Sequence, residues 1–312
     1  MSTAIQMTDL RKTYRPVLSK RGATVAVDGL TLEIERGEIF GLLGANGAGK
    51  TTTIKMIAGL ILPDSGSVIF PSFEKRPTIG AVLEGSRNLY WRLSPWENIR
   101  YFGELRGIPI PELRRQSAEL LPLYGLTEKR DKPAQTLSRG MQQKLAVVLA
   151  LLGEPDILLL DEPTLGLDVE SSLTIRQLLR RLCDERGITM VLTTHQMDVA
   201  HALARRIGIM SAGKLAACER VDTMVDLLRR QDYVARMRSV DWERLLPALS
   251  STGTNFLQLD EQRPEQRSVR FMLDSAQQVY GLMQTLHDAN VELLDFRQEQ
   301  PTLEEVFLQV TS

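Results

Sequence analysis

Short apolar segments, separated by helical patterns, recur along the first two thirds of the chain. The stretches "GEIFGLLG" (37–44), "ILLL" (157–160) and "ITMVLTT" (188–194) are rich in apolar residues, as is typical of parallel strands buried on both faces. Between them, 50–60 ("KTTTIKMIAGL") reads as a helix, and from Gln142 apolar residues recur three and four positions apart. This alternation predicts an α/β fold with a parallel sheet at its centre.

The order of elements changes in the last third of the chain. A helix-like stretch, "RVDTMVDLLRRQ" (220–231), leads into residues that read as β-α-β-β-α-β, a small ferredoxin-like α+β pattern. A final helix is predicted from Pro301 onward, since proline suits a first helical position. The predicted organisation is a main domain at 1–218, a linker helix at 219–232 and an accessory domain at 233–312.

Charge changes sign at the same boundary. Residues 1–218 carry 28 Lys and Arg against 23 Asp and Glu, whereas residues 219–312 carry 10 against 16 and contain no lysine. The positive balance of the first part suits a polyphosphate ligand. The sequence contains no clustered basic stripe of the kind typical of nucleic-acid binding proteins, so we expect no nucleic-acid partner.

The first residues and the apolar runs bear on location. The start "MSTAIQMTDLRKTY" has no long apolar core of a secretory signal. The run "LAVVLALLG" (145–153) is far shorter than the roughly 18 to 20 residues that a spanning helix needs. Cys183 and Cys218 lie far apart without neighbouring histidines, which favours a reducing compartment and no metal site there. We expect a cytoplasmic protein that does not itself cross a membrane.

A glycine-rich loop follows the first of the apolar strands. Residues "GANGAGKT" (44–51) match the pattern G-x-x-x-x-G-K-[ST], with a predicted strand before and a helix after. Glycine at Gly44 and Gly49 lets backbone N–H groups converge on phosphate oxygens. Lys50 supplies positive charge to the outer phosphates, and the Thr51 hydroxyl is placed to ligate Mg²⁺. The loop predicts binding of a nucleoside triphosphate.

Two adjacent carboxylates, Asp161 and Glu162, follow the apolar strand at 157–160. The carboxyl ends of parallel strands form the edge of an open α/β sheet where ligands bind. Because side chains alternate along a strand, the two carboxylates are expected to point in different directions. Asp161 suits the water shell of Mg²⁺, and Glu162 suits orienting or deprotonating an attacking water.

A third candidate precedes the helical pattern that begins at Gln142. Ser138 and Gly140 lie just before this helix, where a hydroxyl and free backbone donors can meet an anion. The alternative is an ordinary helix cap.

In this order, the motifs resemble those of the ATP-binding subunit of ATP-binding cassette (ABC) transporters. "GANGAGKT" is similar to the family's Walker A motif, "LSRGMQQK" to its signature, "ILLLDEP" to Walker B, "LGLD" to the D-loop and "VLTTH" to the switch histidine. The resemblance covers residues 1 to about 218. It implies an ATPase with a P-loop NTPase cassette, whose mixed sheet core is interrupted by a helical subdomain at about 88–154.

The resemblance also implies roles for individual residues. The implied ATP contacts in the loop are Gly44, Asn46, Gly47, Ala48, Gly49, Lys50, Thr51 and Thr52. Tyr14 would stack on the adenine, the alternative being an exposed tyrosine on an early strand. His195 would contact the γ-phosphate, and Asp168 of the D-loop would also approach ATP. Ser138 and Gly140 would face the γ-phosphate held by a second subunit, which implies a dimer around two ATP molecules. A homodimer is favoured, and a heterodimer is possible.

Two departures from the family pattern change individual assignments. Arg139 and Met141 stand where the commonest signature, "LSGGQ", has glycine and glutamine. Glu84 occupies the place of a glutamine that reaches Mg²⁺ and water in most members, and we assign it as a catalytic and metal candidate. Its effect stays open, because a carboxylate accepts hydrogen bonds but does not donate them as an amide does.

Three aromatic residues follow Glu84. Tyr90, Trp91 and Trp96 would line a groove that receives the membrane subunit, because aromatic side chains suit interfaces. The alternative is packing inside the helical subdomain.

The C-terminal region, with its ending "PTLEEVFLQVT" (301–311), resembles that of ATPase subunits of drug, antibiotic and polysaccharide exporters of the ABC-2 type. The implied function is ATP hydrolysis that drives a separate polytopic permease, from a peripheral position on the cytoplasmic face of the cell membrane. A soluble ABC ATPase acting on DNA or ribosomes is an alternative, although the long coiled coil or second cassette of such proteins is missing from the sequence. An importer ATPase would fit residues 1–218 equally well. The transported substrate is not readable, since the permease selects it.

Overall fold

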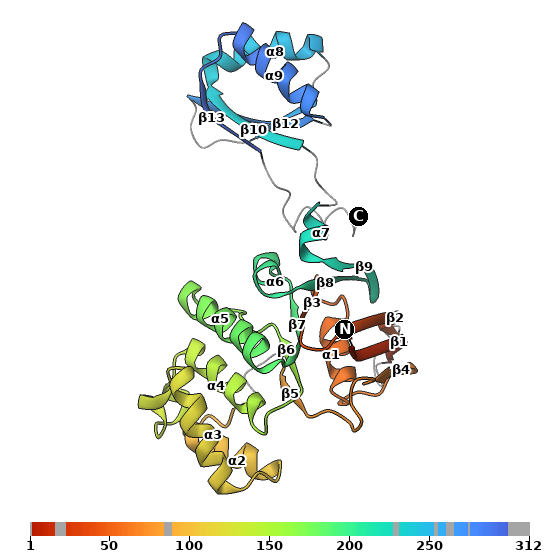
Figure 1. The fold of residues 1–312 in the computed structure, drawn as a ribbon, viewed down its shortest axis with the longest axis vertical. Helices are drawn as coiled ribbons and strands as arrows, with labels where there is room; N and C mark the ends of the chain where they lie inside the picture. Colours follow the sequence, from red (N-terminus) through yellow and green to blue (C-terminus); the bar gives the residue numbers. More distant parts are fainter. Residues whose placement is uncertain are drawn as a thin grey trace. The chain divides into compact units, whose positions relative to one another are not determined.

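The computed structural model describes residues 2–15, 23–83, 89–226, 231–252, 255–259, 265–273 and 275–298. These residues form two compact units, and the division lies between Val221 and Asp222 (Figure 1).

The first unit is built on a six-stranded sheet with the order β5-β6-β7-β3-β8-β9. Its strands are β3 (Ile39–Gly44), β5 (Ile79–Val82), β6 (Ile157–Asp161), β7 (Thr189–Thr194), β8 (Arg206–Ser211) and β9 (Lys214–Arg220). All neighbours pair in parallel except β8 and β9, which are antiparallel. Every residue of β3, β6 and β7 is buried, as their apolar runs predict. The predicted α/β architecture with a mixed sheet is confirmed.

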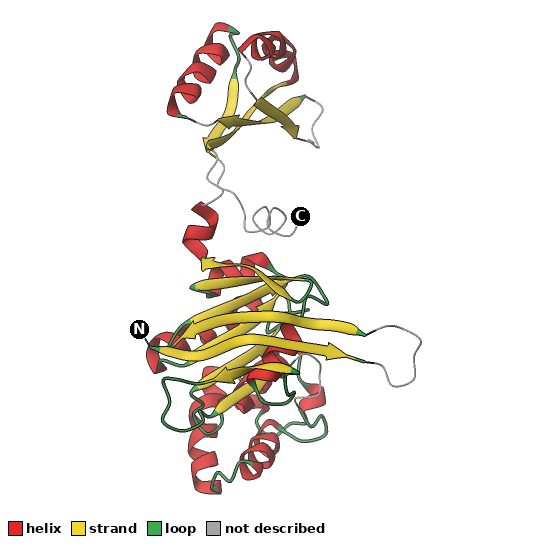
Figure 2. Cartoon of the chain, turned by 90° about the vertical axis from the view of Figure 1, so that its right-hand side faces the viewer, coloured by secondary structure: helices red, strands yellow, loops and turns green. Residues whose placement is uncertain are grey.

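A second sheet covers one face of this core. It consists of β1 (Thr3–Tyr14), β2 (Thr24–Glu35) and β4 (Ser65–Ile69) in the antiparallel order β2-β1-β4, with β1 and β2 as long neighbouring strands (Figure 2). Helix α1 (Lys50–Ile57) packs against β2 of this sheet and against β3, β6 and β7 of the main sheet. The helix that leaves the glycine-rich loop is therefore held inside an apolar core.

Helices gather on the other face of the main sheet (Figure 1). They are α2 (Pro95–Leu105), α3 (Ile110–Leu123), α4 (Arg139–Leu151), α5 (Val169–Arg186) and α6 (Met197–Leu203), with 3-10 turns at Thr127–Lys129 and Ala134–Thr136. Helix α2 begins after Ser94 with a capping box. In this box the Ser94 hydroxyl accepts from Glu97 N at 3.2 Å, and Glu97 Oε2 accepts from Ser94 N at 2.8 Å.

Helix α4 begins earlier than its apolar spacing predicts. The pattern starts at Gln142, but the Ser138 hydroxyl caps the helix by accepting from Met141 N at 3.3 Å, so the first turn starts at Arg139. Gly140 consequently lies inside the first turn rather than before the helix.

The second unit contains the predicted order of elements, β-α-β-β-α-β. These are β10 (Gln231–Arg238), α8 (Ser239–Thr252), β11 (Asn255–Leu259), β12 (Gln266–Leu273), α9 (Ala276–Asp288) and β13 (Leu293–Gln298). The sheet order is β11-β12-β10-β13, and all neighbours are antiparallel. The assigned role of this unit as an accessory domain stays a prediction.

The connection at 219–232 differs from a single helix. Strand β9 runs to Arg220 because Glu219 and Arg220 pair with β8, helix α7 spans Val221–Asp226, and β10 begins at Gln231. The helix predicted from Pro301 lies outside the described residues. Among the helices of the described ranges, none has the combined length and apolarity that a membrane crossing would require.

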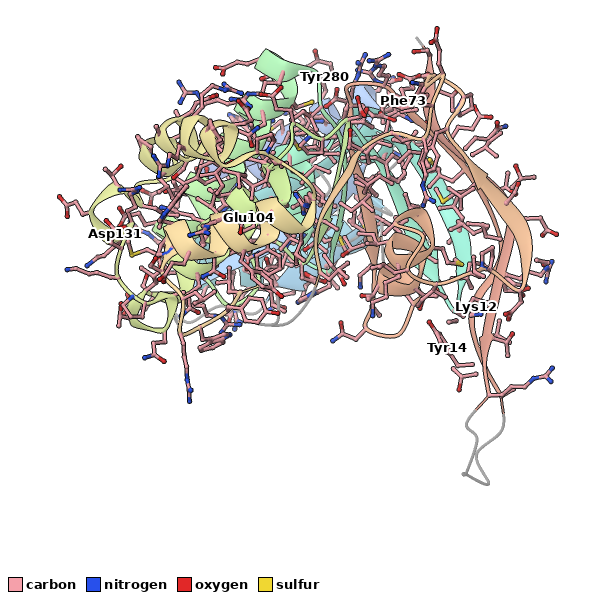
Figure 3. All side chains as sticks on the ribbon, turned by 90° about the horizontal axis from the view of Figure 1, so that it is seen from below. Lys12, Tyr14, Phe73, Glu104, Asp131 and Tyr280 are labelled. Atoms are coloured by element: carbon pink, nitrogen blue, oxygen red, sulfur yellow. The ribbon has the colours of Figure 1, made fainter. Side chains whose placement is uncertain are left out.

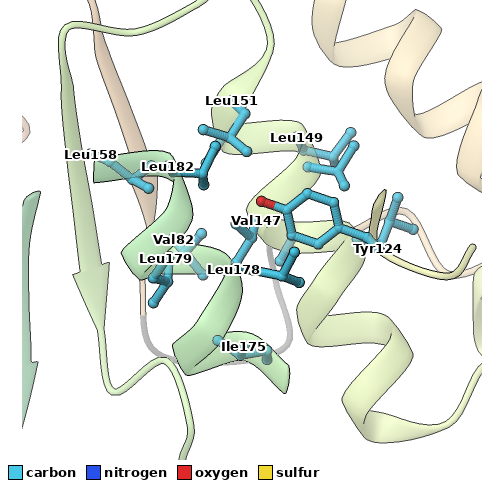
Figure 4. Close-up of a cluster of buried hydrophobic side chains, with 14 of the residues drawn as sticks. Val82, Tyr124, Val147, Leu149, Leu151, Leu158, Ile175, Leu178, Leu179 and Leu182 are labelled. Atoms are coloured by element: carbon cyan, nitrogen blue, oxygen red, sulfur yellow. The ribbon is translucent and has the colours of Figure 1, made fainter. Parts of the chain in front are cut away.

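Tyr124 places a polar atom in the apolar core between α4, α5 and the sheet. Its side chain is 2% exposed, and Figure 4 shows its hydroxyl directed into a cluster of leucine and valine side chains. This hydroxyl has no hydrogen-bond partner among the described residues. Burial raises the pKa of Tyr124 far more than Arg186 lowers it, so the side chain is neutral.

We expect Tyr124→Phe to increase the free energy of unfolding by about 1 kcal/mol, because the change removes an unsatisfied buried hydroxyl and keeps the ring. Urea denaturation measures the shift. The matched control is Tyr280→Phe, at a side chain that is 76% exposed, where we expect no change. A lower midpoint for Tyr124→Phe would contradict this interpretation of its hydroxyl.

Candidate active site

The glycine-rich loop joins β3 to α1 at the carboxyl edge of the main sheet. A Cβ atom on Gly44 would lie 2.6 Å from the Met210 carbonyl oxygen, and one on Gly49 would lie 2.2 Å from that of Ala26. Gly49 also has a φ of +105°, which favours glycine. Both glycines are therefore required by the backbone packed beneath the loop.

Lys50 places a buried ammonium group inside the curve of this loop. Its side chain is 6% exposed, and its Nζ donates to the carbonyl oxygens of Gly44 at 2.6 Å and Ala45 at 3.2 Å. Glu162 Oε1 is 3.9 Å from the same nitrogen. A cation in this position is suited to receive the outer phosphates of a nucleotide.

Asp161 and Glu162 lie at the end of β6 and have different partners. Asp161 Oδ1 accepts from the Thr51 hydroxyl at 3.1 Å and, in a short hydrogen bond, from the Thr193 hydroxyl. Glu162 Oε1 lies 2.9 Å from His195 Nδ1. Glu162 has a φ of +51°, and this left-handed conformation turns the chain directly after the strand.

The second oxygen of each carboxylate indicates where a ligand fits. Asp161 Oδ2 and Glu162 Oε2 are buried and have no hydrogen-bond partner among the described residues. Leaving such oxygens unpaired is unfavourable, and a hydrated divalent cation would satisfy them. The hydroxyl of Thr51 and the carboxylate of Asp161 supply the oxygen ligands that Mg²⁺ prefers, with phosphate and water completing its shell. The residues therefore fit Mg²⁺ bound together with a nucleotide.

A cavity of about 520 Å³ brings most of the predicted residues together. Its lining comprises Thr24, Ala26, Asn46, Gly47, Ala48, Gly49, Lys50, Thr51, Thr52, Glu162, Leu165 and His195. The loop, the Walker B glutamate and the switch histidine thus share one site, although they are far apart in the sequence.

Tyr14 is not part of the cavity lining. It lies at the end of β1, where its side chain is 42% exposed and Lys12 is nearby on the same strand (Figure 3). Its contact with adenine stays a prediction. Glu84 lies outside the described residues.

Ser138, Gly140 and Asp168 do not line the cavity either. Asp168 caps α5, because its Oδ1 and Oδ2 accept from the Ser171 amide and hydroxyl, both at 2.8 Å. These bonds, the one from the Ser171 amide first, lower the pKa of Asp168. A Cβ atom on Gly140 would lie 2.4 Å from Ser171 Oγ. The signature segment and the D-loop therefore pack against each other within one subunit.

Arg139, the departure in the signature, adds to this packing. Gly166 of the D-loop has a φ of +70°, and a Cβ atom there would lie 2.5 Å from the Arg139 guanidinium carbon. Arg139 therefore lies against the backbone of the D-loop.

Sequence reasoning did not single out Thr193. Its hydroxyl donates to Asp161, and it accepts from the Glu162 amide at 3.3 Å. The available signal was the pair of threonines at the end of a strand whose other residues, apart from Thr189, are apolar.

Comparisons with known proteins identify the family of the chain. The family model described as ABC transporter matches residues 27–165. The chain is 30% identical to the linearmycin resistance ATP-binding protein LnrL of Bacillus subtilis, over 98% of both chains. It is 33% identical to the daunorubicin/doxorubicin resistance ATP-binding protein DrrA of Streptomyces peucetius, over 99% of this chain and 92% of DrrA.

A methionine import ATP-binding protein, MetN of Halalkalibacterium halodurans, is 35% identical over 68% of this chain and 64% of MetN. The dimeric cassette MJ0796, solved in a post-hydrolysis state bound to ADP and Pi, is 27% identical, with a TM-score of 0.61. That alignment covers 70% of this chain and 98% of MJ0796. Because LnrL and DrrA are matched along nearly their whole lengths, the chain belongs to the ABC transporter family and is an ATP-binding subunit with ATPase activity.

Proposed function

We propose that the chain hydrolyses ATP at two composite sites of a dimer and thereby drives export through a separate polytopic permease. The observation that carries this proposal is that the predicted site residues fall into two separate groups within one chain. The cavity contains the phosphate loop, Glu162 and His195, whereas Ser138 and Gly140 lie outside it at the start of α4, where Ser138 is exposed and Gly140 packs against Ser171 of α5. A second subunit would supply its signature surface to the open side of the nucleotide.

The contacts assign a role to each residue of the cavity. Lys50 and the loop amides hold the phosphates, and Thr51 with Asp161 would hold Mg²⁺, which neutralises phosphate charge when bound. Glu162 accepts the proton of the attacking water. His195 holds Glu162 through Nδ1 and keeps Nε2 for a second partner, which we assign to the γ-phosphate.

Coverage of the relatives supports an exporter over an importer. LnrL and DrrA, both named for drug resistance, match 98% and 99% of this chain, whereas two methionine import proteins match 68% and 80% of it. We assign the chain to the same kind of system, acting from the cytoplasmic face of the cell membrane. The permease would select the substrate.

The permease contact is assigned to the aromatic residues before and within α2. Tyr90 and Trp91 are 47% and 45% exposed, while Trp96 packs partly into the helical core beneath the Arg130 guanidinium. Exposed aromatic side chains of this kind suit a protein interface. A homodimer is favoured, because one chain contains both halves of the site, although a second, related chain would also serve.

We expect Glu162→Gln to lower kcat by about 10² to 10⁴, because the amide does not accept a proton as a general base does. Glutamine has nearly the same size and leaves Lys50 and the phosphate loop unchanged, so nucleotide binding is retained. Phosphate release and equilibrium nucleotide binding measure the two effects. Glu170→Gln, at an exposed position in the first turn of α5, is the matched control. Hydrolysis at the wild-type rate would exclude Glu162 as the base.

The composite site is tested by mixing two inactive variants. Lys50→Ala removes the phosphate cation and abolishes nucleotide binding. Ser138→Asp keeps a good helix cap but places a negative charge against the phosphate of the partner. Each alone is expected to be inactive. A 1:1 mixture regains about a quarter of wild-type activity, because half of the dimers are mixed and each retains one intact site.

Activity of the mixture that stays at the level of the single variants would contradict sites shared between two chains. Lys55→Ala, on the same helix as Lys50 but outside the cavity lining, is the control for the lysine substitution.

The proposed binding to a permease is tested by tagging the full chain in its native host, solubilising the membranes gently with ATP and vanadate, and identifying the proteins that co-purify. We expect a polytopic protein of about six spans to co-purify in stoichiometric amount, because the chain is proposed to bind a separate permease. Each span of about 20 apolar residues is readily recognised in the sequence of the co-purified protein. Recovery with ribosomes or DNA in the soluble fraction would overturn the transport assignment and leave the ATPase assignment intact.

A further inference from the structure

Thr193 connects the two carboxylates of the site. It is the second-last residue of β7, is fully buried and lies directly opposite Asp161 in the parallel pairing of β6 and β7. Its hydroxyl donates to Asp161 Oδ1 and accepts from the Glu162 amide at 3.3 Å. The Thr193 hydroxyl therefore donates its single proton to the Asp161 carboxylate and accepts, through a lone pair, from the backbone amide of Glu162.

These contacts determine where Asp161 directs its remaining oxygen. Oδ1 accepts from two hydroxyls, Thr193 from within the sheet and Thr51 from the start of α1. With Oδ1 held by two donors, the rotation of the carboxylate is restricted, and Oδ2 is the oxygen left without a hydrogen-bond partner among the described residues. Without Thr193, Thr51 would be the one side chain in the described part of the chain that donates to Asp161, and Thr51 is itself assigned to the cation.

The same residue supports the turn at Glu162. The Glu162 amide donates to the carbonyl oxygen of Thr193 at 3.1 Å as well as to its hydroxyl. A φ of +51° is uncommon for glutamate and needs such support from its surroundings. This turn directs Glu162 to His195 rather than along the strand.

We propose that Thr193 is a positioning residue that fixes the Mg²⁺ carboxylate and the catalytic base relative to each other through one hydroxyl. The inference rests on the proposed role of Asp161 at Mg²⁺. Thr193 is fully buried and does not line the cavity, so it acts through Asp161 and Glu162 rather than on the nucleotide.

A matched control lies on the same strand. Thr189 is also fully buried, and its hydroxyl accepts from the Gly37 amide at 3.0 Å, at the opposite end of β7. Thr189→Val and Thr193→Val make the same change of atoms in the same strand, and only the second touches the carboxylates.

The experiment titrates free Mg²⁺ at a fixed concentration of a non-hydrolysable ATP analogue, and calorimetry measures binding to the full-length chain. We expect Thr193→Val to need about tenfold more Mg²⁺ than the wild type, the effect of losing one hydrogen bond to a charged group. Thr193→Ser keeps the hydroxyl and restores the wild-type requirement. Thr189→Val leaves it unchanged, and in EDTA all variants bind the analogue equally.

An unchanged Mg²⁺ requirement in Thr193→Val would overturn the proposal, as would an equal shift in Thr189→Val. If Thr193→Val does not fold, Thr193→Ala removes the same hydroxyl without adding a methyl group and is judged by the same criteria. A wild-type chain whose analogue binding does not respond to Mg²⁺ overturns the magnesium assignment itself, whereas a normal response with an unaffected Thr193 variant removes only the positioning role.

Discussion

The parallel register of β3, β6 and β7 is the constraint on which the site depends. Asp161 pairs with Thr193, and Leu43 pairs with Thr194, so the strands end at the same edge. The glycine-rich loop, the two carboxylates and His195 each follow directly after one of these ends. Because side chains alternate along a strand, a shift of one residue in β7 would turn Thr193 away from Asp161. The packing of the apolar residues in these strands thereby also determines the relative positions of the residues in the site.

The charges of the site oppose folding rather than support it. The side chains of Lys50 and Glu162 are 6% and 7% exposed. Asp161 and Glu162 each keep one buried carboxylate oxygen without a hydrogen-bond partner among the described residues. Burying a carboxylate oxygen without a hydrogen-bond partner is unfavourable. A bound nucleotide with its cation would supply the missing partners, and a ligand that binds only the folded state stabilises it. The free site is organised for its ligand at a cost in stability.

Features governed by local pattern could be predicted from the sequence. The apolar runs located β3, β6 and β7, and the glycine spacing located the phosphate loop. Features set by packing between distant segments could not be predicted. The start of α4 depends on a cap at Ser138, and β9 continues to Arg220 because it pairs with β8. Thr193 was missed for the same reason, since only the sheet register reveals its neighbour Asp161.

The contact between the signature segment and the D-loop bears on how the proposed dimer would work. Gly140 lies so close to Ser171 that a side chain at Gly140 has no room, and Ser171 is bonded to Asp168. A displacement of the α4 N-terminus must therefore displace the start of α5, which follows Walker B by a few residues. In a composite site, closing of the signature segment on the partner's nucleotide would thus also shift the chain next to the subunit's own carboxylates, Asp161 and Glu162. Protein interiors are closely packed and transmit such displacements without large deformation. The close packing of Gly140 against Ser171 therefore links the start of α4 to the start of α5.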